Sequence, residues 1–559
     1  MLARLLGLLR RRSEPKAAEA TTVTARVPPP PPLIGSVLDT YRIPENGTPD
    51  ASAEVFVVDE DGLGMYIVKL PELDDEETAA LSLLKRNLLD SIPTTATGRP
   101  DEVIRGYVRA TSDELGVGAV VERSEEKVLF YLLREFLGFW EIDTLLNDDR
   151  IEEVSLTRYD KPARVLHRDF SEYAFMQTSI TYPSEERLQA FVRRLAQFGG
   201  TTVSLAQPSL EVTLHGTSDR RVTATLGEEI TRPGSTYSIR KQKEKPMTLV
   251  QLASPEHPRW RPQEPGPPSE AAMAYEETYA HKTLSVLMAA YFWLLLERTT
   301  NVLIAGDTNS GKTTLMNSIL ALTNPKAKVV TAEDVLEINL PDHLHWQRMK
   351  TRSHRAGLSP TSQKYEYGLP ELLKLALRFS PTILSLGEMR GEESETLAAA
   401  ITLGFSTMTT IHAENAERCV QRLTTPPMRF AEGHVRDITA IATMRKVPLG
   451  DGRVVRRVVS VDEIKPVSAD SHEVLNVFRY DVRSDSFSPT TPAEVVDRSY
   501  RLGEIAQSFG WPQSRVQESL TSRAACLARA SDDASSPETV SAMVRSFARQ
   551  ELQAISMEA

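Results

Sequence analysis

The stretch GDTNSGKTT, residues 306–314, contains the residues of this chain that are best suited to bind phosphate. A glycine, four residues and then Gly-Lys-Thr is the spacing in which backbone N–H groups surround a phosphate and a lysine reaches its outer oxygens. An apolar strand pattern precedes the loop and a helical pattern follows it, and a helix N-terminus favours an anion. This pattern predicts that the loop binds ATP and that the Thr313 hydroxyl is a ligand of Mg²⁺. Its predicted binding residues are Gly306, Thr308, Asn309, Ser310, Gly311, Lys312, Thr313 and Thr314.

Hydrolysis of a bound nucleotide needs a carboxylate that orients water and a group that senses the terminal phosphate. Three candidates follow apolar strand patterns: Glu333 ends KVVTAE, Glu388 follows TILSLG, and His412 follows TMTTI. Taken alone, each of these residues could equally be an ordinary polar side chain at the end of a strand, without a catalytic role. Because the carboxyl ends of parallel strands meet at one edge of a sheet, we expect the three to lie beside the phosphate loop.

The elements that position these residues are alternating strands and helices rich in Val, Ile and Leu, which predict a parallel sheet covered on both faces. The fold class is therefore α/β. We expect a basic, proline-rich tail at 1–50, a small α/β unit at 51–120, an α+β domain at 121–253 with Ser184 capping a helix, a proline-rich linker at 254–269, a nucleotide-binding core at 270–465, and C-terminal strands and helices at 466–559.

The composition of the chain disfavours several classes of protein. A net charge of −11 is a poor match to a protein that wraps nucleic acid. Two cysteines are too few for a disulfide framework, which favours a reducing, cytoplasmic setting. The longest apolar run, at 284–296, is shorter than the roughly 18 residues of a membrane span, so we expect a buried helix there. The opening MLARLLGLLRRR is either a frayed tail or a short basic amphipathic helix on a membrane.

Four boxes occur in a fixed order: GDTNSGKT, TAEDVLEINLP, LSLGEMRGEE and TTIHAE. In this order they resemble the type II and type IV secretion ATPases, the traffic ATPases that assemble or retract pili and turn the archaellum. Upstream stretches such as YSIRKQKEKPMT are most similar to the archaeal pilus and archaellum branch. The resemblance implies a RecA-like P-loop core behind an α+β domain, assembled as a homo-hexameric ring that moves a polytopic membrane platform protein.

The same resemblance implies a role for each candidate. Glu333 is similar to the catalytic glutamate that polarises water, Glu388 to the Walker B glutamate that acts through Mg²⁺, and His412 to the histidine that senses the γ-phosphate. Arg221 and Arg240 match arginines that swing onto the nucleotide from the preceding domain, with Arg232 a weaker candidate. Two positions depart from the family pattern: Thr382 replaces an acid, and Phe405 replaces a histidine.

We therefore predict an ATP-hydrolysing motor, peripheral to the cytoplasmic membrane, that serves a type IV filament or a secretion machine. One alternative is a nucleic-acid translocase on a similar core, which the acidity and the lack of interleaved aromatic and basic residues disfavour. The other is a regulatory subunit that binds ATP without turnover. The presence of Glu333, Glu388 and Lys312 argues against that reading.

Overall fold

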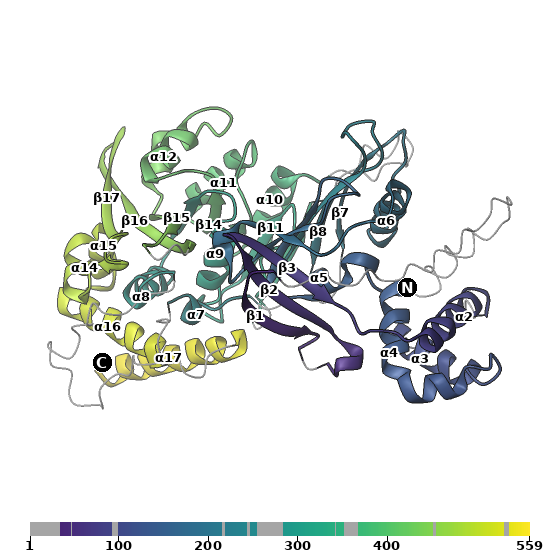
Figure 1. The fold of residues 1–559 in the computed structure, drawn as a ribbon. Helices are drawn as coiled ribbons and strands as arrows, with labels where there is room; N and C mark the ends of the chain where they lie inside the picture. The colour runs from purple at the N-terminus through teal and green to yellow at the C-terminus, as the bar shows by residue number, and fades with distance from the viewer. Residues whose placement is uncertain are drawn as a thin grey trace. The chain divides into compact units, whose positions relative to one another are not determined.

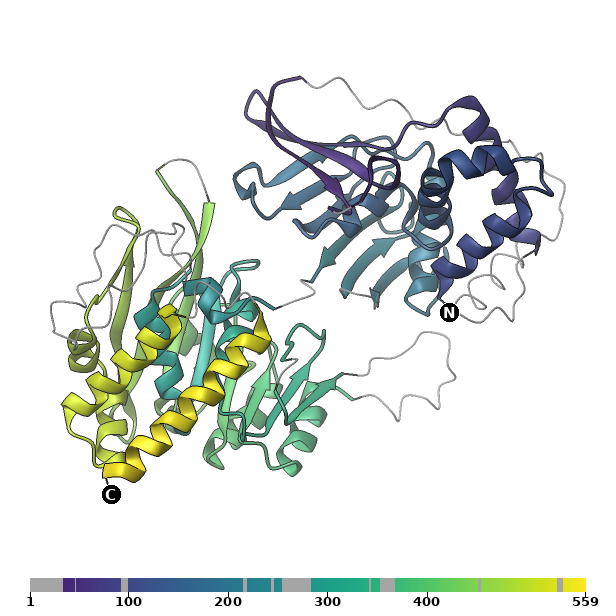
Figure 2. The same cartoon turned by 90° about the horizontal axis from the view of Figure 1, so that it is seen from below.

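A computed structural model describes residues 34–45, 47–91, 99–214, 219–242, 246–253, 283–340, 343–351, 367–450, 454–529 and 536–558 (Figure 1 and Figure 2). The chain divides into two compact units, residues 1–243 and residues 244–559. The predicted linker at 254–269 and the first 33 residues of the predicted tail lie outside the described residues.

The first unit is built on a nine-stranded sheet of order β1-β2-β3-β6-β5-β4-β9-β8-β7. Strand β3 pairs with β6, so residues predicted as a small unit at 51–120 and as a domain at 121–253 share this sheet. Residues 36–43, which the sequence interpretation placed in the tail, form its edge strand β1 and pair with β2. The strands are β1 (Ser36–Ile43), β2 (Ala53–Glu60), β3 (Leu63–Lys69), β4 (Ile151–Leu156), β5 (Arg164–His167), β6 (Phe175–Thr178), β7 (Ser209–Leu214), β8 (Arg220–Thr225) and β9 (Thr236–Lys241).

Helix α6 (Glu185–Phe198) packs its apolar face into the core of this sheet. The Ser184 hydroxyl accepts a hydrogen bond from the Arg187 N–H at 3.3 Å, which confirms the predicted N-cap. A second apolar core is formed between the helices α2, α3 and α4, which Figure 1 shows beside one another. The remaining helices of the unit are α2 (Asp75–Ser91), α3 (Pro100–Thr111), α4 (Gly118–Phe136) and α5 (Asp143–Asn147).

A buried imidazole, that of His167, joins β1 and β3 to the turn before β4. Its Nδ1 accepts the Asp169 N–H at 3.1 Å, and its Nε2 lies 3.2 Å from the Tyr41 hydroxyl. The hydroxyls of Tyr41 and Tyr66 both donate to Oδ2 of Asp148, at 2.8 and 2.6 Å. Because Nδ1 accepts and Tyr41 donates to Asp148, a neutral His167 carries its proton on Nε2 and donates it to Tyr41.

This network predicts that the first unit loses stability in mild acid. Burial lowers the pKa of His167 below its usual 6.5. As the pH drops below about 6.5, the histidine therefore becomes protonated in the unfolded chain before it does so in the folded chain. The free energy of unfolding then falls, with a slope of at most about 1.4 kcal/mol per pH unit. We expect His167→Gln, which keeps a donor to Tyr41, to flatten this dependence. Pulsed hydrogen exchange of residues 151–178 across urea, at pH 7.5 and 5.5, measures it; equal pH dependence in both proteins would contradict it.

The second unit is built on another nine-stranded sheet, of order β12-β11-β13-β14-β10-β15-β16-β17-β18. From β12 to β15 neighbouring strands are parallel, and from β15 to β18 they are antiparallel. The sheet therefore runs through both the predicted core at 270–465 and the predicted C-terminal region at 466–559. The strands are β10 (Asn301–Gly306), β11 (Val329–Glu333), β12 (Trp346–Lys350), β13 (Ile383–Leu386), β14 (Ser406–Ile411), β15 (Ala440–Pro448), β16 (Val454–Ser468), β17 (Ser471–Asp481) and β18 (Ser486–Ser488).

Both faces of this sheet are covered by helices. In β10, Val302 and Ile304 enter one apolar core, whereas Leu303 and Ala305 enter the other, so successive residues of the strand alternate between the two faces. This confirms the predicted doubly covered sheet. The helices of the unit are α7 (Leu249–Ala253), α8 (Val286–Leu295), α9 (Lys312–Leu320), α10 (Leu369–Arg378), α11 (Glu393–Thr402), α12 (Ala416–Thr424), α13 (Glu432–Arg436), α14 (Pro492–Arg498), α15 (Tyr500–Phe509), α16 (Gln513–Arg529) and α17 (Pro537–Glu558).

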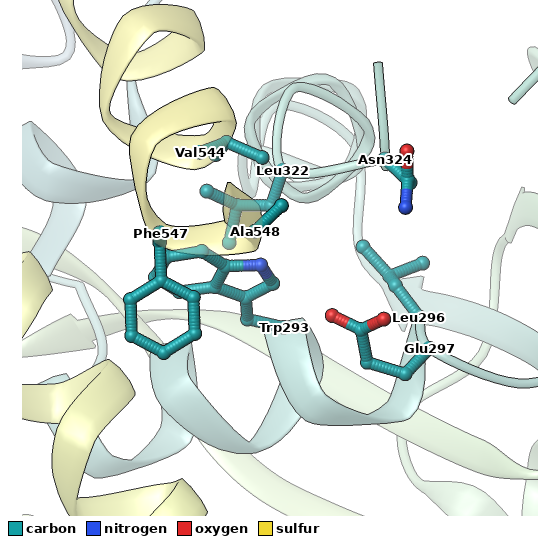
Figure 3. A pocket seen from close by; sticks show the side chains of 8 residues that line it. All are labelled: Trp293, Leu296, Glu297, Leu322, Asn324, Val544, Phe547 and Ala548. Atoms are coloured by element: carbon teal, nitrogen blue, oxygen red, sulfur yellow. The ribbon is translucent and has the colours of Figure 1, made fainter. Parts of the chain in front are cut away.

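Helix α8 is the apolar segment that the sequence predicts to be buried, and all ten of its residues are buried. No helix within the described parts of the chain is long and apolar enough to cross a bilayer. The C-terminal helix α17 packs over α8, and Figure 3 shows the Phe547 ring beside Trp293. The centroids of the two rings lie 4.7 Å apart. The Arg523 guanidinium lies 4.9 Å from the Phe547 ring and pairs with Glu297 at 3.0 Å.

Candidate nucleotide site

The phosphate loop leaves β10 at Gly306 and enters α9 at Lys312. A Cβ on Gly306 would come within 2.3 Å of the Met444 carbonyl oxygen, so only glycine fits there. Asn309 and Gly311 have φ of 61° and 95°, in the left-handed region that these two residue types adopt most readily. The loop therefore has the tight, positive-φ backbone that a phosphate cradle requires.

Lys312 is nearly buried, with 8% of its side chain exposed. Its ammonium donates to the Asp307 carbonyl oxygen across the loop at 2.7 Å. Thr313 and Thr314 are half-buried in the first turn of α9, and Thr308 is exposed at the loop tip. The loop thus presents a lysine and three threonine hydroxyls around the start of one helix.

The other predicted residues follow strands of the same parallel set. Strand β14 lies beside β10, β13 lies beside β14, and β11 lies beside β13. Glu333 is the last residue of β11, Glu388 follows β13, and His412 follows β14. All three therefore lie at the carboxyl edge of the sheet, where β10 also delivers the phosphate loop.

Side-chain contacts connect three of these positions. The Lys312 ammonium lies 3.5 Å from Nδ1 of His412, and Nε2 of His412 lies 2.9 Å from Oε1 of Glu388. Burial, followed by the nearby Lys312 charge, lowers the pKa of His412 below its usual 6.5. A neutral imidazole accepts from Lys312 on Nδ1, and its Nε2 lies close to Glu388 without an aligned hydrogen bond. The structure therefore brings together Lys312, His412 and Glu388.

Glu333 is 1% exposed and lies on the strand next to β13. Its Oε1 accepts the N–H groups of Glu337 and Ile338, both at 2.7 Å, while Oε2 lies 3.6 Å from Nε of Arg348. Burial raises the pKa of Glu333 to about 7, although these two N–H groups lower it. A Cβ on Gly387 would lie 3.2 Å from Cγ of Glu333, so the glycine before Glu388 lets the two strand ends approach closely.

A carboxyl group with a pKa near neutrality is suited to accept a proton from water at physiological pH. At this edge of the sheet, two carboxylate oxygens are buried without an aligned hydrogen bond from any described residue: Oε2 of Glu333 and Oε1 of Glu388. Buried acceptors of this kind are uncommon in native proteins. Both oxygens are thus left for a water molecule or a ligand at the carboxyl edge of the sheet.

Sequence reasoning missed four arginines around the site. Arg390 pairs with Oε2 of Glu388 and Arg348 lies against Glu333. Arg422 donates to the His412 carbonyl at 2.6 Å, and Arg456 donates to the Asn309 carbonyl at 3.1 Å. Only Arg390 had a signal in the sequence, since it lies two residues after Glu388 in the same box.

Arg221 and Arg240 belong to the first unit, on the neighbouring antiparallel strands β8 and β9. They are direct partners in the β-register, and Arg221 pairs with Glu211 at 2.7 Å. Because the phosphate loop belongs to the second unit, the role of these arginines stays a prediction.

The two departures from the family pattern lie away from these groups. Thr382 precedes β13, whereas Glu388 follows that strand; Phe405 precedes β14, whereas His412 follows it. Both departures are therefore at the amino edge of the sheet. The Thr382 hydroxyl accepts the Lys328 N–H at 3.0 Å, a structural contact next to β11.

Comparison with known proteins decides the family. Residues 277–440 match the family described as type II/IV secretion system protein. An uncharacterized protein of Methanocaldococcus jannaschii is 35% identical over 244 residues, covering 43% of this chain and 86% of the relative. The chain belongs to the type II/IV secretion system ATPase family. The archaeal relative fits the branch that the upstream stretches indicate.

Other known proteins match over different shares of the chain. A second uncharacterized protein of Methanocaldococcus jannaschii is 28% identical over 71% of this chain and 64% of its own length. The chain thus spans less than two thirds of this relative. The type IV secretion system protein PtlH of Bordetella pertussis is 39% identical over 22% of this chain and 35% of its own length. The solved structure of the Yersinia pseudotuberculosis ATPase DotB is 14% identical over 69% of this chain and 93% of that chain, with a TM-score of 0.40.

Proposed function

We propose that this chain is an ATP-hydrolysing motor that powers assembly of a type IV pilus-like filament or a secretion machine. The observation that carries the proposal is the contact series from Lys312 through His412 to Glu388, with buried Glu333 on the adjoining strand end. A phosphate loop alone binds nucleotide, whereas hydrolysis needs groups that activate water and sense phosphate. Membership in the secretion family supports the same conclusion.

The residues present fit ATP with Mg²⁺. The positive-φ loop and the start of α9 suit phosphate, and the Thr313 hydroxyl and Glu388 carboxylate are the hard oxygen ligands that Mg²⁺ prefers. Within the described residues, no cluster of three or more acidic, histidine or cysteine side chains forms a protein-only metal site. Mg²⁺ characteristically binds through one or two protein groups plus substrate phosphates and water, where it neutralises charge on the phosphates.

Each side chain then has a role. Glu333 accepts the proton of the attacking water through Oε2, the oxygen that lacks a hydrogen bond from the described residues. Glu388 would hold Mg²⁺ together with Thr313, and the bound ion would neutralise charge on the phosphates. His412, held between Lys312 and Glu388, reports whether the terminal phosphate is present. Arg221 and Arg240 neutralise charge in the transition state when the first unit closes on the nucleotide.

Work requires that nucleotide favour one arrangement of rigid parts over another. The two compact units supply such parts. We propose that six copies form a ring, that the ring lies at the cytoplasmic face of the membrane, and that closure of the units around ATP moves a polytopic platform protein that drives filament subunits. These partners rest on the family alone.

A binding-only regulatory subunit is an alternative that the departures at Thr382 and Phe405 would favour if they lay at the nucleotide site. Both positions lie at the amino edge of the sheet, opposite the acids, so they give it no support.

The proposal predicts phosphate release from Mg-ATP by the purified chain, with no increase on adding single-stranded DNA. Absence of turnover would favour the regulatory subunit, and stimulation by DNA would favour a translocase. Copurification with a polytopic membrane protein tests the proposed platform.

A further inference from the structure

Helix α9 begins at the phosphate loop and carries the buried amide side chain of Asn317. Lys312 is its first residue, and Asn317, which is 6% exposed, lies five residues later. Oδ1 of Asn317 accepts the backbone N–H of Asn339 at 3.2 Å. The helix that begins at the phosphate loop is thereby connected to the segment that follows β11.

That segment also holds Glu333. Its Oε1 accepts the N–H groups of Glu337 and Ile338, so three successive backbone donors, at 337, 338 and 339, all point at side-chain acceptors. The side chains of Ile338 and Leu340 are buried in the same apolar core as α9. In this conformation Asn339 of the segment is hydrogen-bonded to α9, while Glu337 and Ile338 are hydrogen-bonded to the Glu333 carboxylate.

We propose that Asn317 is a positioning residue that fixes, through the Asn339 amide, the two N–H groups that orient the Glu333 carboxylate. With Oε1 held, Oε2 is the oxygen presented to water. Without Asn317 the segment gains freedom, the N–H groups lose alignment, and the carboxylate rotates between its two oxygens. This inference rests on the proposed function, because it concerns how Glu333 works rather than whether the chain hydrolyses ATP.

A purely structural role is the competing explanation, since a buried N–H must be paired wherever it lies. Such a role predicts lower stability with unchanged kinetics of the folded protein. A positioning role predicts a change in kcat at nearly constant KM, because alignment matters in the transition state and not in nucleotide binding. It also predicts a changed pH profile. The charged groups facing Glu333 are Arg348 from β12 and Glu337 from the segment itself.

The test uses the full-length chain, Mg-ATP and steady-state phosphate release between pH 5.5 and 9. Asn317→Leu removes the acceptor; we expect kcat to fall about tenfold, KM to stay within about twofold, and the acid limb of the profile to move to higher pH, because the N–H groups that lower the pKa of Glu333 are loosened. Asn317→Asp keeps the accepting oxygen and should recover most of kcat. Ser318→Ala, which removes a buried hydroxyl that donates to the Leu315 carbonyl within α9, is the matched control and should resemble wild type.

A double-mutant cycle separates positioning from other effects. In a Glu333→Gln background, Asn317→Leu should change the residual turnover less than about twofold, because the group through which it acts is already gone. A full tenfold loss in that background, or wild-type kinetics in Asn317→Leu, would overturn the inference. Asn317→Ala replaces the leucine variant if that one does not fold. A wild-type chain without turnover would refute the proposed function itself, which is a different result from an active wild type with an unaffected Asn317 variant.

Discussion

Glu333→Gln should lower kcat for ATP hydrolysis by at least about a hundredfold while leaving the affinity for ATP nearly unchanged, since a positioned general base contributes roughly 10²–10⁴ in rate. Glutamine has the volume of glutamate, and its carbonyl oxygen still accepts the N–H groups of Glu337 and Ile338. It cannot accept the proton of water. The substitution therefore removes chemistry and keeps the packing of a side chain that is 1% exposed.

Steady-state phosphate release together with ATP binding measures both parts of this prediction. Glu395→Gln, an exposed acid on α11 of the same core, is the control and should behave like wild type. Since burial raises the pKa of Glu333 to about 7, wild-type kcat/KM should fall as the pH drops below about 7, where the base becomes protonated. If Glu333→Gln retained more than half of the wild-type rate, another group would be the base.

Local patterns account for what the sequence predicted well. The phosphate loop is a contiguous motif, the buried helix α8 is a contiguous apolar run, and the Ser184 cap precedes a helix of clear periodicity. The convergence of Glu333, Glu388 and His412 at one sheet edge follows from the rule that parallel strands align their carboxyl ends. In each case, neighbouring residues or a general rule of topology carried the information.

Pairing between strands that are far apart in the chain produces no local sequence pattern. Nothing near Tyr66 in the sequence indicates that β3 pairs with β6 more than a hundred residues later, so the sequence predicts two units where the structure has one sheet. Strand β1 follows a proline-rich stretch, and for that reason the sequence predicts a tail there. Arg456 contacts the phosphate loop from β16, which reaches it only through the order of the strands. Contacts of this kind depend on tertiary packing, which single-sequence periodicity does not encode.

Lys312→Met should weaken binding of Mg-ATP by at least about a hundredfold, which is the loss expected from roughly two charge-assisted hydrogen bonds. Methionine keeps an unbranched apolar side chain, one heavy atom shorter than that of lysine, and carries no charge. In the structure Lys312 is 8% exposed, and its ammonium already faces into the loop, against the Asp307 carbonyl, so little reorganisation is needed for it to meet phosphate. Lys312→Arg should not restore binding, because a planar guanidinium is wider than the ammonium that this loop encloses.

Titration with a fluorescent ATP analogue in the presence of Mg²⁺ measures this loss. The matched control is Lys326→Met, which removes an exposed lysine shortly after the end of α9 and should bind like wild type. A Kd within about threefold of wild type for Lys312→Met would show that the loop does not bind phosphate through this lysine. Taken with Glu333→Gln, the two variants separate binding from cleavage: one should lose the nucleotide, and the other should keep it and leave it intact. Only a chain in which the loop and the strand-end acids serve successive steps of one reaction gives both results.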